Sequence, residues 1–392
     1  MIRRKVVFIH ESIPFGGGEQ VTINIAPYLS DRGFDIYVLA CHIKNYNLKN
    51  INLVQLPNRT KSDTSDNLDF IIDFVRDNDV AILILPGVYF KDLVKIKRTT
   101  NVKVIFALHS IPLWEATNKY ILAKARASRS FFKRLDWILI QKIKYEVLNL
   151  HVKKTIRQYQ EVYKLCDAYL TLTGQYKEML GKYLYLNCGD RTKISVMPNS
   201  IELPQEVDLE HKQKEIIYVG RLSYADKRVD RLLLVWKHIY RIFPDWTLRI
   251  IGSGPEEERL KLFVKENNLE NIIFEGYQKD VVQYYKSASI LCLTSTFEGW
   301  PLSLAEAQSY GVIPIAFDCS SGVHDILSPN GVNGMLVKPF DLEQFEKDLC
   351  LLLSNATLRA EMSRAVIEKS KTYSPDIVGA LWIQLFKSLL ES

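Results

Sequence analysis

The feature that most constrains the fold is a repeated alternation of short apolar runs with segments of helical spacing. In the first half of the chain, β-branched and apolar residues gather at 5–10, 35–41, 81–86, 102–110, 168–173 and 193–200. The pattern then starts again at 215–221, 247–254, 271–276, 289–295, 313–318 and 334–338. Strands that alternate with helices in this way form parallel sheets covered by helices on both faces. The alternation therefore predicts two doubly wound α/β domains.

A polar stretch at 199–214 interrupts the alternation and marks the domain boundary. A chain of 392 residues is also too long for one ordinary hydrophobic core. We therefore expect an N-terminal domain over 1–200, a C-terminal domain over 201–373 and a last helix over 374–392. Ligands of such sheets lie beyond the C-terminal ends of the strands, so we look for site residues in the loops that follow them.

Composition excludes several classes of protein. No run approaches the roughly 18 to 20 apolar residues of a membrane-spanning helix, and the N-terminus lacks a signal-peptide pattern. The six cysteines form no C-x-x-C pair, which favours reduced thiols over disulfides or a zinc site. Residues 1–200 hold 30 Lys and Arg against 18 Asp and Glu (+12), and the remainder holds 21 against 27 (−6). We expect a cytoplasmic protein whose basic half faces an anionic partner.

Residues 119–157 combine positive charge with large apolar side chains. They include eleven Lys and Arg, interleaved with Ile, Leu and the aromatic residues Phe131, Phe132 and Trp137. A basic helical segment of this kind can lie on an anionic bilayer with its apolar side in the headgroup boundary. We therefore expect peripheral contact with the inner face of the membrane. The alternative is an ordinary helix pair with a solvated face; no familiar nucleic-acid-binding motif is visible.

Two glutamates, Glu298 and Glu306, stand in an otherwise apolar segment after a predicted strand. A buried carboxylate needs a polar partner, and an ionised carboxylate only accepts hydrogen bonds, so a pair of adjacent sugar hydroxyls suits each of them. Pro301 suits the beginning of a helix, where the N–H groups of Leu302 and Ser303 can hold an anion. The alternative is that both glutamates face solvent or pair with Lys or Arg.

Two cations, Arg221 and Lys227, follow the first strand of the second predicted domain. Two positive groups at a strand end suit a diphosphate, which Arg can bind bidentately while Lys acts as a point charge. The alternative is a solvated basic turn, and we assign Arg228 and Arg231 to that solvated class.

The N-terminal domain offers weaker signals. Three glycines at 16–18 follow the first strand, where backbone N–H groups can approach a phosphate, although their spacing differs from the dinucleotide fingerprint. His109 ends the fourth predicted strand; a lone histidine is more often structural, but its place at a strand end makes it a site candidate. The triplet at 77–79 imitates the D-x-D of metal-dependent transferases, yet it stands at a predicted helix end, so we expect no required metal.

Taken in order, the segments "GGGEQV", "HSIP", "VGRLSYADK", "IIGSGPE", "FEGYQKDV", "FEGWPLSLAEA" and "GVNGMLVKP" resemble those of the retaining family-4 glycosyltransferases. The resemblance is strongest over 215–340 and implies the GT-B fold, in which two Rossmann-like domains face each other across a cleft. Two departures stand out: Pro301 and Arg228 occupy positions where the family often has Gly.

The resemblance also implies roles for individual residues. Glu306 would bind the ribose and Glu298 the donor sugar, while the backbone around Tyr277 would meet the base. Diphosphate binding would fall to Arg221, Lys227, the N–H groups of Leu302 and Ser303, and the N-domain loop at Gly16 and Gly17. His109 would contact the sugar near its anomeric carbon. The catalytic set implied is His109, Glu298, Arg221 and Lys227.

The resemblance, together with these residues, implies a retaining, metal-independent transferase. It would move a hexose from a nucleoside-diphosphate sugar to a lipid-linked or cell-surface glycan acceptor, as in capsule, O-antigen or exopolysaccharide assembly. One alternative is a nucleotide-sugar epimerase of the same fold, which needs acid/base carboxylates in the first domain, where there are few candidates beyond Glu11 and Glu19. The other is a membrane-binding scaffold without turnover. A nicotinamide oxidoreductase is disfavoured because the dinucleotide fingerprint is absent.

Overall fold

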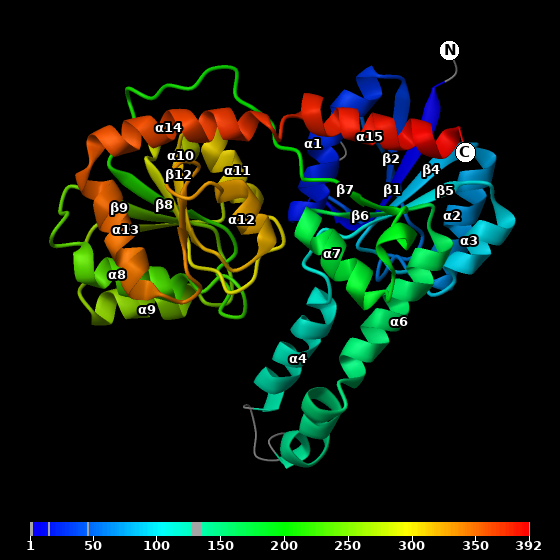
Figure 1. Ribbon diagram of the computed structural model, residues 1–392, viewed down its shortest axis with the longest axis horizontal. Coiled ribbons are helices and arrows are strands. Elements are labelled where there is room, and N and C mark those ends of the chain that lie inside the picture. Colours follow the sequence, from blue (N-terminus) through cyan, green and yellow to red (C-terminus); the bar gives the residue numbers. More distant parts are fainter. Residues whose placement is uncertain (1–2, 15, 45–46, 128–134, 392) are drawn as a thin grey trace. The chain divides into compact units, whose positions relative to one another are not determined.

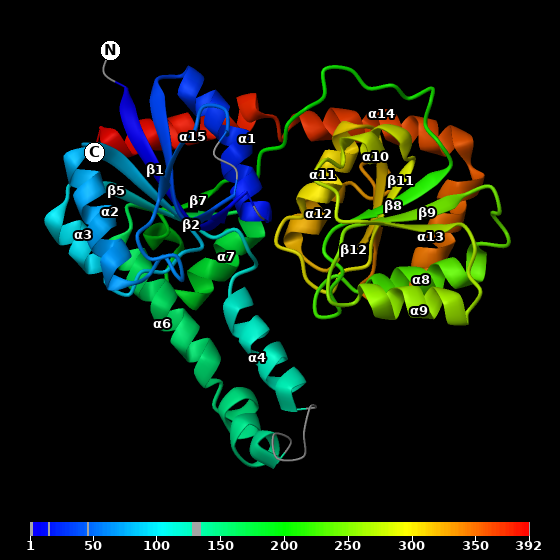
Figure 2. The ribbon, with the colours of Figure 1, turned by 180° about the vertical axis from the view of Figure 1, so that it is seen from behind.

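The computed structural model describes residues 3–14, 16–44, 47–127 and 135–391. The chain divides into two compact units, shown in Figures 1 and 2. The N-terminal domain comprises Met1–Pro198 and Gly379–Ser392, and the C-terminal domain comprises Asn199–Val378.

The N-terminal domain is built on a seven-stranded sheet in which every strand pair is parallel. Its strands are β1 (Arg4–Ile13), β2 (Phe34–Ile43), β3 (Asn52–Gln55), β4 (Val80–Pro86), β5 (Lys103–Ala107), β6 (Ala168–Thr171) and β7 (Ile194–Val196). They lie in the order β3-β2-β1-β4-β5-β6-β7. The order reverses between β1 and β4, which is where ligands of such sheets bind.

The C-terminal domain repeats this plan with six parallel strands. They are β8 (Glu215–Val219), β9 (Thr247–Ile251), β10 (Ile272–Gly276), β11 (Ile290–Leu293), β12 (Ile313–Phe317) and β13 (Met335–Val337), in the order β10-β9-β8-β11-β12-β13. The reversal lies between β8 and β11. The predicted pair of doubly wound α/β domains is confirmed.

Helices connect the strands in both domains. In the N-terminal domain they are α1 (Gly17–Asp31), α2 (Ser65–Asp77), α3 (Leu93–Thr99), α4 (Trp114–Ala127), the π-helical turns η1 (Trp137–Gln141) and η2 (Ile143–Val147), α6 (Leu150–Leu165), α7 (Gly174–Tyr183) and the 3-10 turn η3 (Cys188–Asp190). In the C-terminal domain they are α8 (Val229–Ile239), α9 (Glu257–Glu266), α10 (Val282–Ser287), α11 (Leu302–Ser309), α12 (Ser321–Leu327), α13 (Leu342–Ser354) and α14 (Ala356–Lys371). The last helix, α15 (Pro375–Leu390), begins in the C-terminal unit, and its residues from Gly379 onward belong to the N-terminal unit.

The strands are buried because helices cover both faces of each sheet. Four consecutive residues of β1, from Val6 to Ile9, are at most 2% exposed, which explains why the sequence shows unbroken apolar runs rather than alternation. The rings of Trp382 and Phe386 on α15 contact Phe8 and Phe34, with centroids 6.3 and 5.2 Å apart. The last helix thus completes the core of the N-terminal domain.

Two N-terminal strands differ from the sequence-based prediction. β3 was not predicted: it lies at the edge of the sheet, only four residues long and exposed or half-buried, so it carries little apolar signal. β5 ends at Ala107, earlier than predicted. His109 therefore lies in the loop that follows the C-terminal end of this strand. The triplet at 77–79 lies at the end of α2 as expected.

A helical arm, formed by α4, η1, η2 and α6, extends from the N-terminal sheet (Figures 1 and 2). Its two long helices lie side by side, and the ring of Trp137 packs on those of Tyr120 and Tyr145, each 5.9 Å away. Phe131 and Phe132, which the sequence suggested as membrane anchors, lie outside the described residues. No helix in the described part of the chain is both long and apolar enough to cross a membrane.

Candidate functional site

The first component of the C-terminal site is a buried cluster around Glu298. This carboxylate is 7% exposed and accepts hydrogen bonds from Lys227 Nζ at 2.7 and 2.9 Å and from Ser295 Oγ at 2.6 Å. Lys227 follows β8 and Glu298 follows β11, so they meet where the strand order reverses. Pairing with a lysine was the alternative expected for this glutamate, and the structure shows that pairing.

The second cation, Arg221, lies at the beginning of the loop that follows β8, six residues before Lys227. Its side chain is 65% exposed, and Nη2 donates to Asp226 Oδ2 at 3.0 Å. The other oxygen of Asp226 is buried without a hydrogen-bond partner among the described residues. Asp226 also fixes the neighbouring loop, because its carbonyl accepts from Thr296 N at 2.6 Å. Arg221 is thus held near the strand ends with most of its guanidinium open to an anion.

The assignment of Arg228 and Arg231 to solvent is wrong. Both are half-buried. Arg228 has a φ of 51°, a left-handed conformation that glycine adopts at little cost, and its guanidinium binds Asp230 with two bonds of 2.9 Å. Arg231 donates to the carbonyl of Thr294 and to the hydroxyl of Thr296, both at 3.2 Å. These arginines fix the loops around the site.

Glu306 lies on α11, half-buried, and accepts from the hydroxyl of Tyr285 at 2.9 Å. Burial raises the pKa of this carboxyl, and the Tyr285 hydrogen bond opposes the rise. Tyr285 is itself fixed: its ring stacks on Tyr310 at 5.8 Å, and its carbonyl accepts from Lys212 Nζ at 2.6 Å. Glu306 is therefore oriented before any ligand arrives.

Leu302 and Ser303 begin α11, and Pro301 is its N-cap residue. The first N–H groups of a helix have no intrahelical acceptor and carry the positive end of the helix dipole. The loop that precedes α11 packs closely against the beginning of α12. A Cβ on Gly322 of α12 would lie only 2.0 Å from the carbonyl oxygen of Gly299 in that loop. The helix start thus has a fixed position beside the Glu298 cluster.

Tyr277 lies apart from these residues. It follows β10 directly, in the loop after Gly276, and is 67% exposed. The C-terminal domain therefore brings Arg221, Lys227, Glu298, Leu302 and Ser303 to the strand ends around β8 and β11, and it carries the loop with Tyr277 at the outer strand of the sheet.

The remaining predicted residues belong to the N-terminal domain. Gly16, with a φ of 98°, precedes α1, and Gly17 is the first residue of that helix. His109 contributes to a small cavity with Val21 of α1 and Trp382 of α15. The glycine turn and His109 therefore both lie against α1.

His10 is a residue that sequence reasoning missed. It lies on β1, 3% exposed, with Nε2 2.9 Å from Thr22 Oγ1. Burial, with a smaller contribution from His109, lowers the pKa of His10 to about 3. Its only sequence signal is a histidine within an apolar run.

The low pKa of His10 predicts an acid-sensitive N-terminal domain. Below about pH 6.5 the unfolded chain binds a proton at His10 that the native state does not, so stability falls as pH decreases toward 3. Between pH 6.5 and 5 the free energy of unfolding should therefore fall by about 2 kcal/mol. Urea unfolding at several pH values should show this loss, and His10→Asn should flatten the slope. An unchanged slope in the variant contradicts the assignment.

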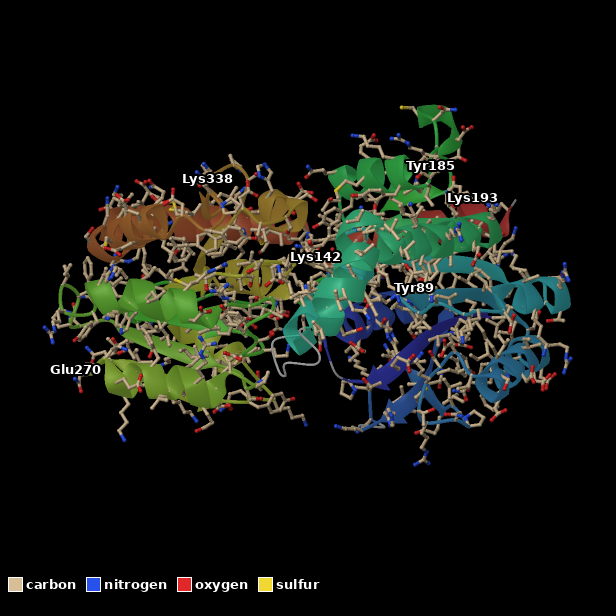
Figure 3. The ribbon with its side chains drawn as sticks, turned by 90° about the horizontal axis from the view of Figure 1, so that it is seen from below. Tyr89, Lys142, Tyr185, Lys193, Glu270 and Lys338 are labelled. Atoms are coloured by element: carbon tan, nitrogen blue, oxygen red, sulfur yellow. The ribbon has the colours of Figure 1, made fainter. Side chains whose placement is uncertain are left out.

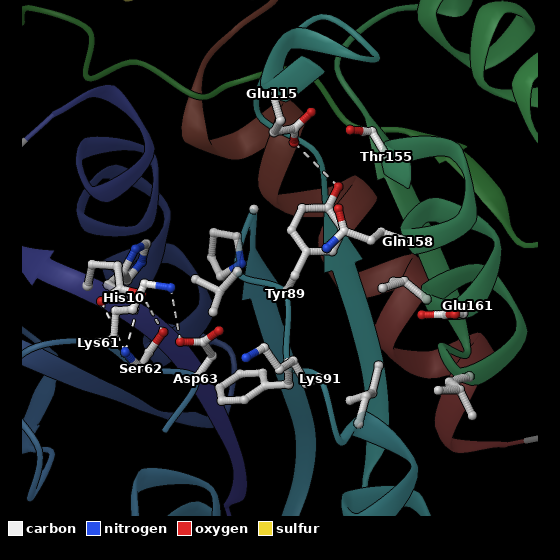
Figure 4. A pocket seen from close by; sticks show the side chains of 18 of the residues that line it. His10, Lys61, Ser62, Asp63, Tyr89, Lys91, Glu115, Thr155, Gln158 and Glu161 are labelled. Carbon is white, nitrogen blue, oxygen red and sulfur yellow. Dashed lines mark hydrogen bonds and ion pairs between the residues drawn. The ribbon is translucent and has the colours of Figure 1, made fainter. Parts of the chain in front are cut away.

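The N-terminal domain also contains a cavity of about 860 Å³ that the sequence did not reveal. Figure 4 shows His10, Lys61, Ser62 and Asp63 on one side and residues of α4 and α6 on the other. Since β1 and β4 supply its inner wall, the cavity lies at the reversal of the strand order. Its residues come from positions 10 to 165, so no local motif announces it.

A hydrogen-bonded cluster centred on Glu115 lines one end of this cavity. Glu115 accepts from the hydroxyls of Tyr159 at 2.7 Å and Tyr89 at 3.4 Å, and the two rings stack 6.0 Å apart. Burial raises the pKa of both tyrosines, so they remain donors at neutral pH. Glu11, at the other end, accepts from the backbone N–H and hydroxyl of Ser62. The cavity therefore presents fixed polar groups suited to hydroxyl-rich ligands.

Solved structures with the same architecture identify the fold. The chain superposes on the crystal structure of HepE from Anabaena, solved with UDP-glucose, with a TM-score of 0.73 and 14% sequence identity. The superposition covers 98% of this chain and 99% of HepE. Two Rossmann-like domains of this kind define the GT-B fold, and the expected fold is confirmed. Among the described residues, no group of three or more His, Cys, Asp and Glu could hold a metal ion.

Family and sequence comparisons agree with this fold. Residues 199–369, which make up most of the C-terminal domain, match the family model of glycosyl transferases group 1. An uncharacterized glycosyltransferase of Haemophilus influenzae is 29% identical over 96% of both chains. The lipopolysaccharide 1,6-galactosyltransferase of Salmonella typhimurium is 36% identical over 41% of this chain and 46% of its own length. These matches support glycosyltransferase activity.

Proposed function

We propose that the protein is a retaining glycosyltransferase of family 4 that transfers a hexose-type sugar from a nucleoside-diphosphate sugar to a lipid-linked or cell-surface glycan. The observation that carries the proposal is the cluster of Lys227, Ser295 and Glu298 beside the start of α11, with Glu306 held by Tyr285. With the neighbouring Arg221 it combines two cations for a diphosphate with two carboxylates for hydroxyl pairs. The galactosyltransferase relative supports a glycan acceptor.

In the proposed mechanism the protein stabilises the leaving group electrostatically. As the anomeric bond breaks, negative charge grows on the diphosphate, and Lys227, Arg221 and the first N–H groups of α11 stabilise it without reorganisation. As Lys227 turns toward the diphosphate, sugar hydroxyls replace it as donors to Glu298. We propose a front-face route in which the departing phosphate helps to deprotonate the acceptor hydroxyl. Because the cations are supplied by side chains, we propose that no metal is required.

Replacing Glu306 tests the donor site. Glu306→Gln removes a charged acceptor from the ribose hydroxyls and should weaken donor binding about 10- to 100-fold, since hydrogen bonds to charged groups contribute about 1.5–3 kcal/mol. Tyr285→Phe should have a smaller effect in the same direction, because it releases Glu306 from its orientation. Calorimetric titration with UDP-, GDP- and ADP-sugars measures the donor affinity of both variants. Repeating it with EDTA shows whether binding depends on a divalent metal.

The matched control is Glu258→Gln, since this glutamate is 91% exposed on α9. Unchanged affinity in Glu306→Gln would remove the ribose assignment, and a strict need for divalent metal would remove the metal-independent mechanism. If the donor incubated alone becomes an epimeric nucleotide sugar, the epimerase alternative holds. Binding with neither hydrolysis nor transfer would favour a scaffold.

We also propose that the protein associates peripherally with the cytoplasmic face of the membrane through the arm. The support is a set of large apolar side chains that are 45 to 69% exposed: Leu135, Ile138, Leu139, Ile140, Ile143, Val147, Leu148 and Leu150. Lys142, labelled in Figure 3, Lys144, Lys153, Lys154 and Arg157 accompany them, with Asp136 and Glu146 as the acidic residues of 135–157. Vesicles containing phosphatidylglycerol should bind more protein than neutral vesicles at low salt. Equal binding contradicts the proposal.

A further inference from the structure

Another cavity, of about 630 Å³, lies in the C-terminal domain beside the residues that hold Glu306. Lys212, from the segment before β8, and Tyr310, which follows α11, both line it. These two residues fix Tyr285: Lys212 Nζ donates to its carbonyl at 2.6 Å, and the Tyr310 ring stacks on its ring at 5.8 Å. A ligand in this cavity therefore reaches both residues that hold the tyrosine bound to Glu306.

The groups that line this cavity favour a small anion. Lys212 uses one of its three ammonium donors within the protein, and Lys286 of α10 makes no ion pair in the described part of the chain. Asp208 pairs with His211 at 2.7 Å, which leaves Glu206 as the lining carboxylate without an ion pair among the described residues. A ligand's carboxylate or phosphate oxygens can accept hydrogen bonds from both lysines. The volume lies in the range of about 300–1,000 Å³ that holds small-molecule ligands.

Lys212 also makes anion binding sensitive to pH. Burial lowers the pKa of its ammonium to about 7, and Asp208 has a smaller, opposite effect. Besides the charged groups already named, Glu210, Arg359 and Arg364 share a smaller cavity with Lys212. A bound anion would stabilise the charged form of the lysine, so binding above pH 7 should take up a proton.

We infer that this cavity is a regulatory site for a small carboxylate or phosphate anion, which draws Lys212 away from the Tyr285 carbonyl and loosens the contact of Tyr285 with Glu306. Its effect on the donor rests on the proposed function, whereas the anion site itself does not. A bound anion should weaken donor binding, and by reciprocity the donor should weaken anion binding by the same factor. Such coupling is typically about 5- to 150-fold. Since one hydrogen bond is exchanged, we expect the lower end, about fivefold.

Calorimetric titration of the full chain with citrate and, separately, with inorganic phosphate tests the anion site without a donor. The probe that binds more tightly identifies the anion as a carboxylate or a phosphate. Above pH 7 the heat of binding should differ between two buffers of different ionisation enthalpy, because Lys212 takes up a proton. Lys212→Met should remove this difference. His211→Gln should keep it, which would exclude the histidine as the group that titrates.

The variant Lys286→Met separates the anion site from the donor site and replaces Lys212→Met if that change disturbs folding. The Lys286 side chain is exposed and takes no part in holding Tyr285. The variant should therefore bind the anion about tenfold more weakly and keep wild-type donor affinity in the absence of anion. Lys265→Met, exposed on α9, is the matched control and should change neither affinity.

Donor affinity measured at increasing anion concentration completes the test. For the UDP-, GDP- or ADP-sugar that binds, the Kd should rise about fivefold and reach a plateau, because the two ligands occupy different sites. A rise without a plateau would mean direct competition at the diphosphate site and would overturn the inference. An unchanged Kd, no binding of either anion, or equal anion affinity in the wild type and both lysine variants would also overturn it. A wild type that binds the anion with proton uptake but binds no donor would instead overturn the proposed function.

Discussion

Replacing Lys227 with methionine should reduce transfer at least about 100-fold and also destabilise the C-terminal domain. The first effect follows from removing a preorganised cation at the diphosphate, where a single stabilising donor contributes about 10²- to 10³-fold. The second follows because Glu298, 7% exposed, loses the cation that balances its charge, which costs about 3–5 kcal/mol for a buried pair. Single-turnover transfer and urea unfolding measure the two effects separately.

A double variant separates stability from catalysis. Lys227→Met combined with Glu298→Gln removes both charges and should recover most of the lost stability, yet it should remain inactive. Lys237→Met is the matched control, because Lys237 is exposed on α8 and should be neutral in both measurements. Turnover within a few-fold of wild type in Lys227→Met would mean that the diphosphate is held elsewhere.

Gly322→Ala should lower transfer by up to about 100-fold while leaving the protein folded. The new Cβ would lie 2.0 Å from the carbonyl oxygen of Gly299, so the loop that carries Glu298 or the start of α12 must move. Overpacking of this kind costs about 1–3 kcal/mol, and a displacement of about 1 Å at reacting groups can cost 10²-fold in rate. Steady-state transfer assays measure the loss of rate, and thermal unfolding measures the loss of stability.

Gly174→Ala is the comparison for this substitution. Gly174 begins α7, and a Cβ there meets nothing within 4 Å, so stability and transfer should stay at wild-type levels or slightly above. Equal activity in Gly322→Ala and Gly174→Ala would show that the position of the Gly299 loop is unimportant for the reaction.

The strands of the central sheets could be predicted because their burial is encoded locally. Runs such as those of β4 and β12 are apolar throughout, since helices cover both faces of a parallel sheet. The edge strand β3 escaped prediction because its residues are exposed or half-buried and its pairing with β2 is set by distant sequence. Local pattern thus predicts the interior of each sheet better than its edges.

The candidate site was predictable only where its residues are close in sequence. Glu298, Leu302 and Glu306 share one loop and helix, so their spacing carried the signal. The partner of Glu298 is 71 residues away and could not be paired with it by spacing. The cavity around Glu115 depends on strands and helices from the whole N-terminal domain.

The Lys227–Glu298 pair also bears on which ligands the site rejects. Without a donor the two charges neutralise each other, so the pair offers little attraction to a stray anion. A ligand that brings only phosphate would draw Lys227 away from a carboxylate that stays buried and poorly compensated. A sugar diphosphate brings hydroxyls for that carboxylate along with its negative charge. The internal ion pair would thus discriminate against free phosphate and unglycosylated nucleotides by making the exchange unfavourable unless both ends are satisfied.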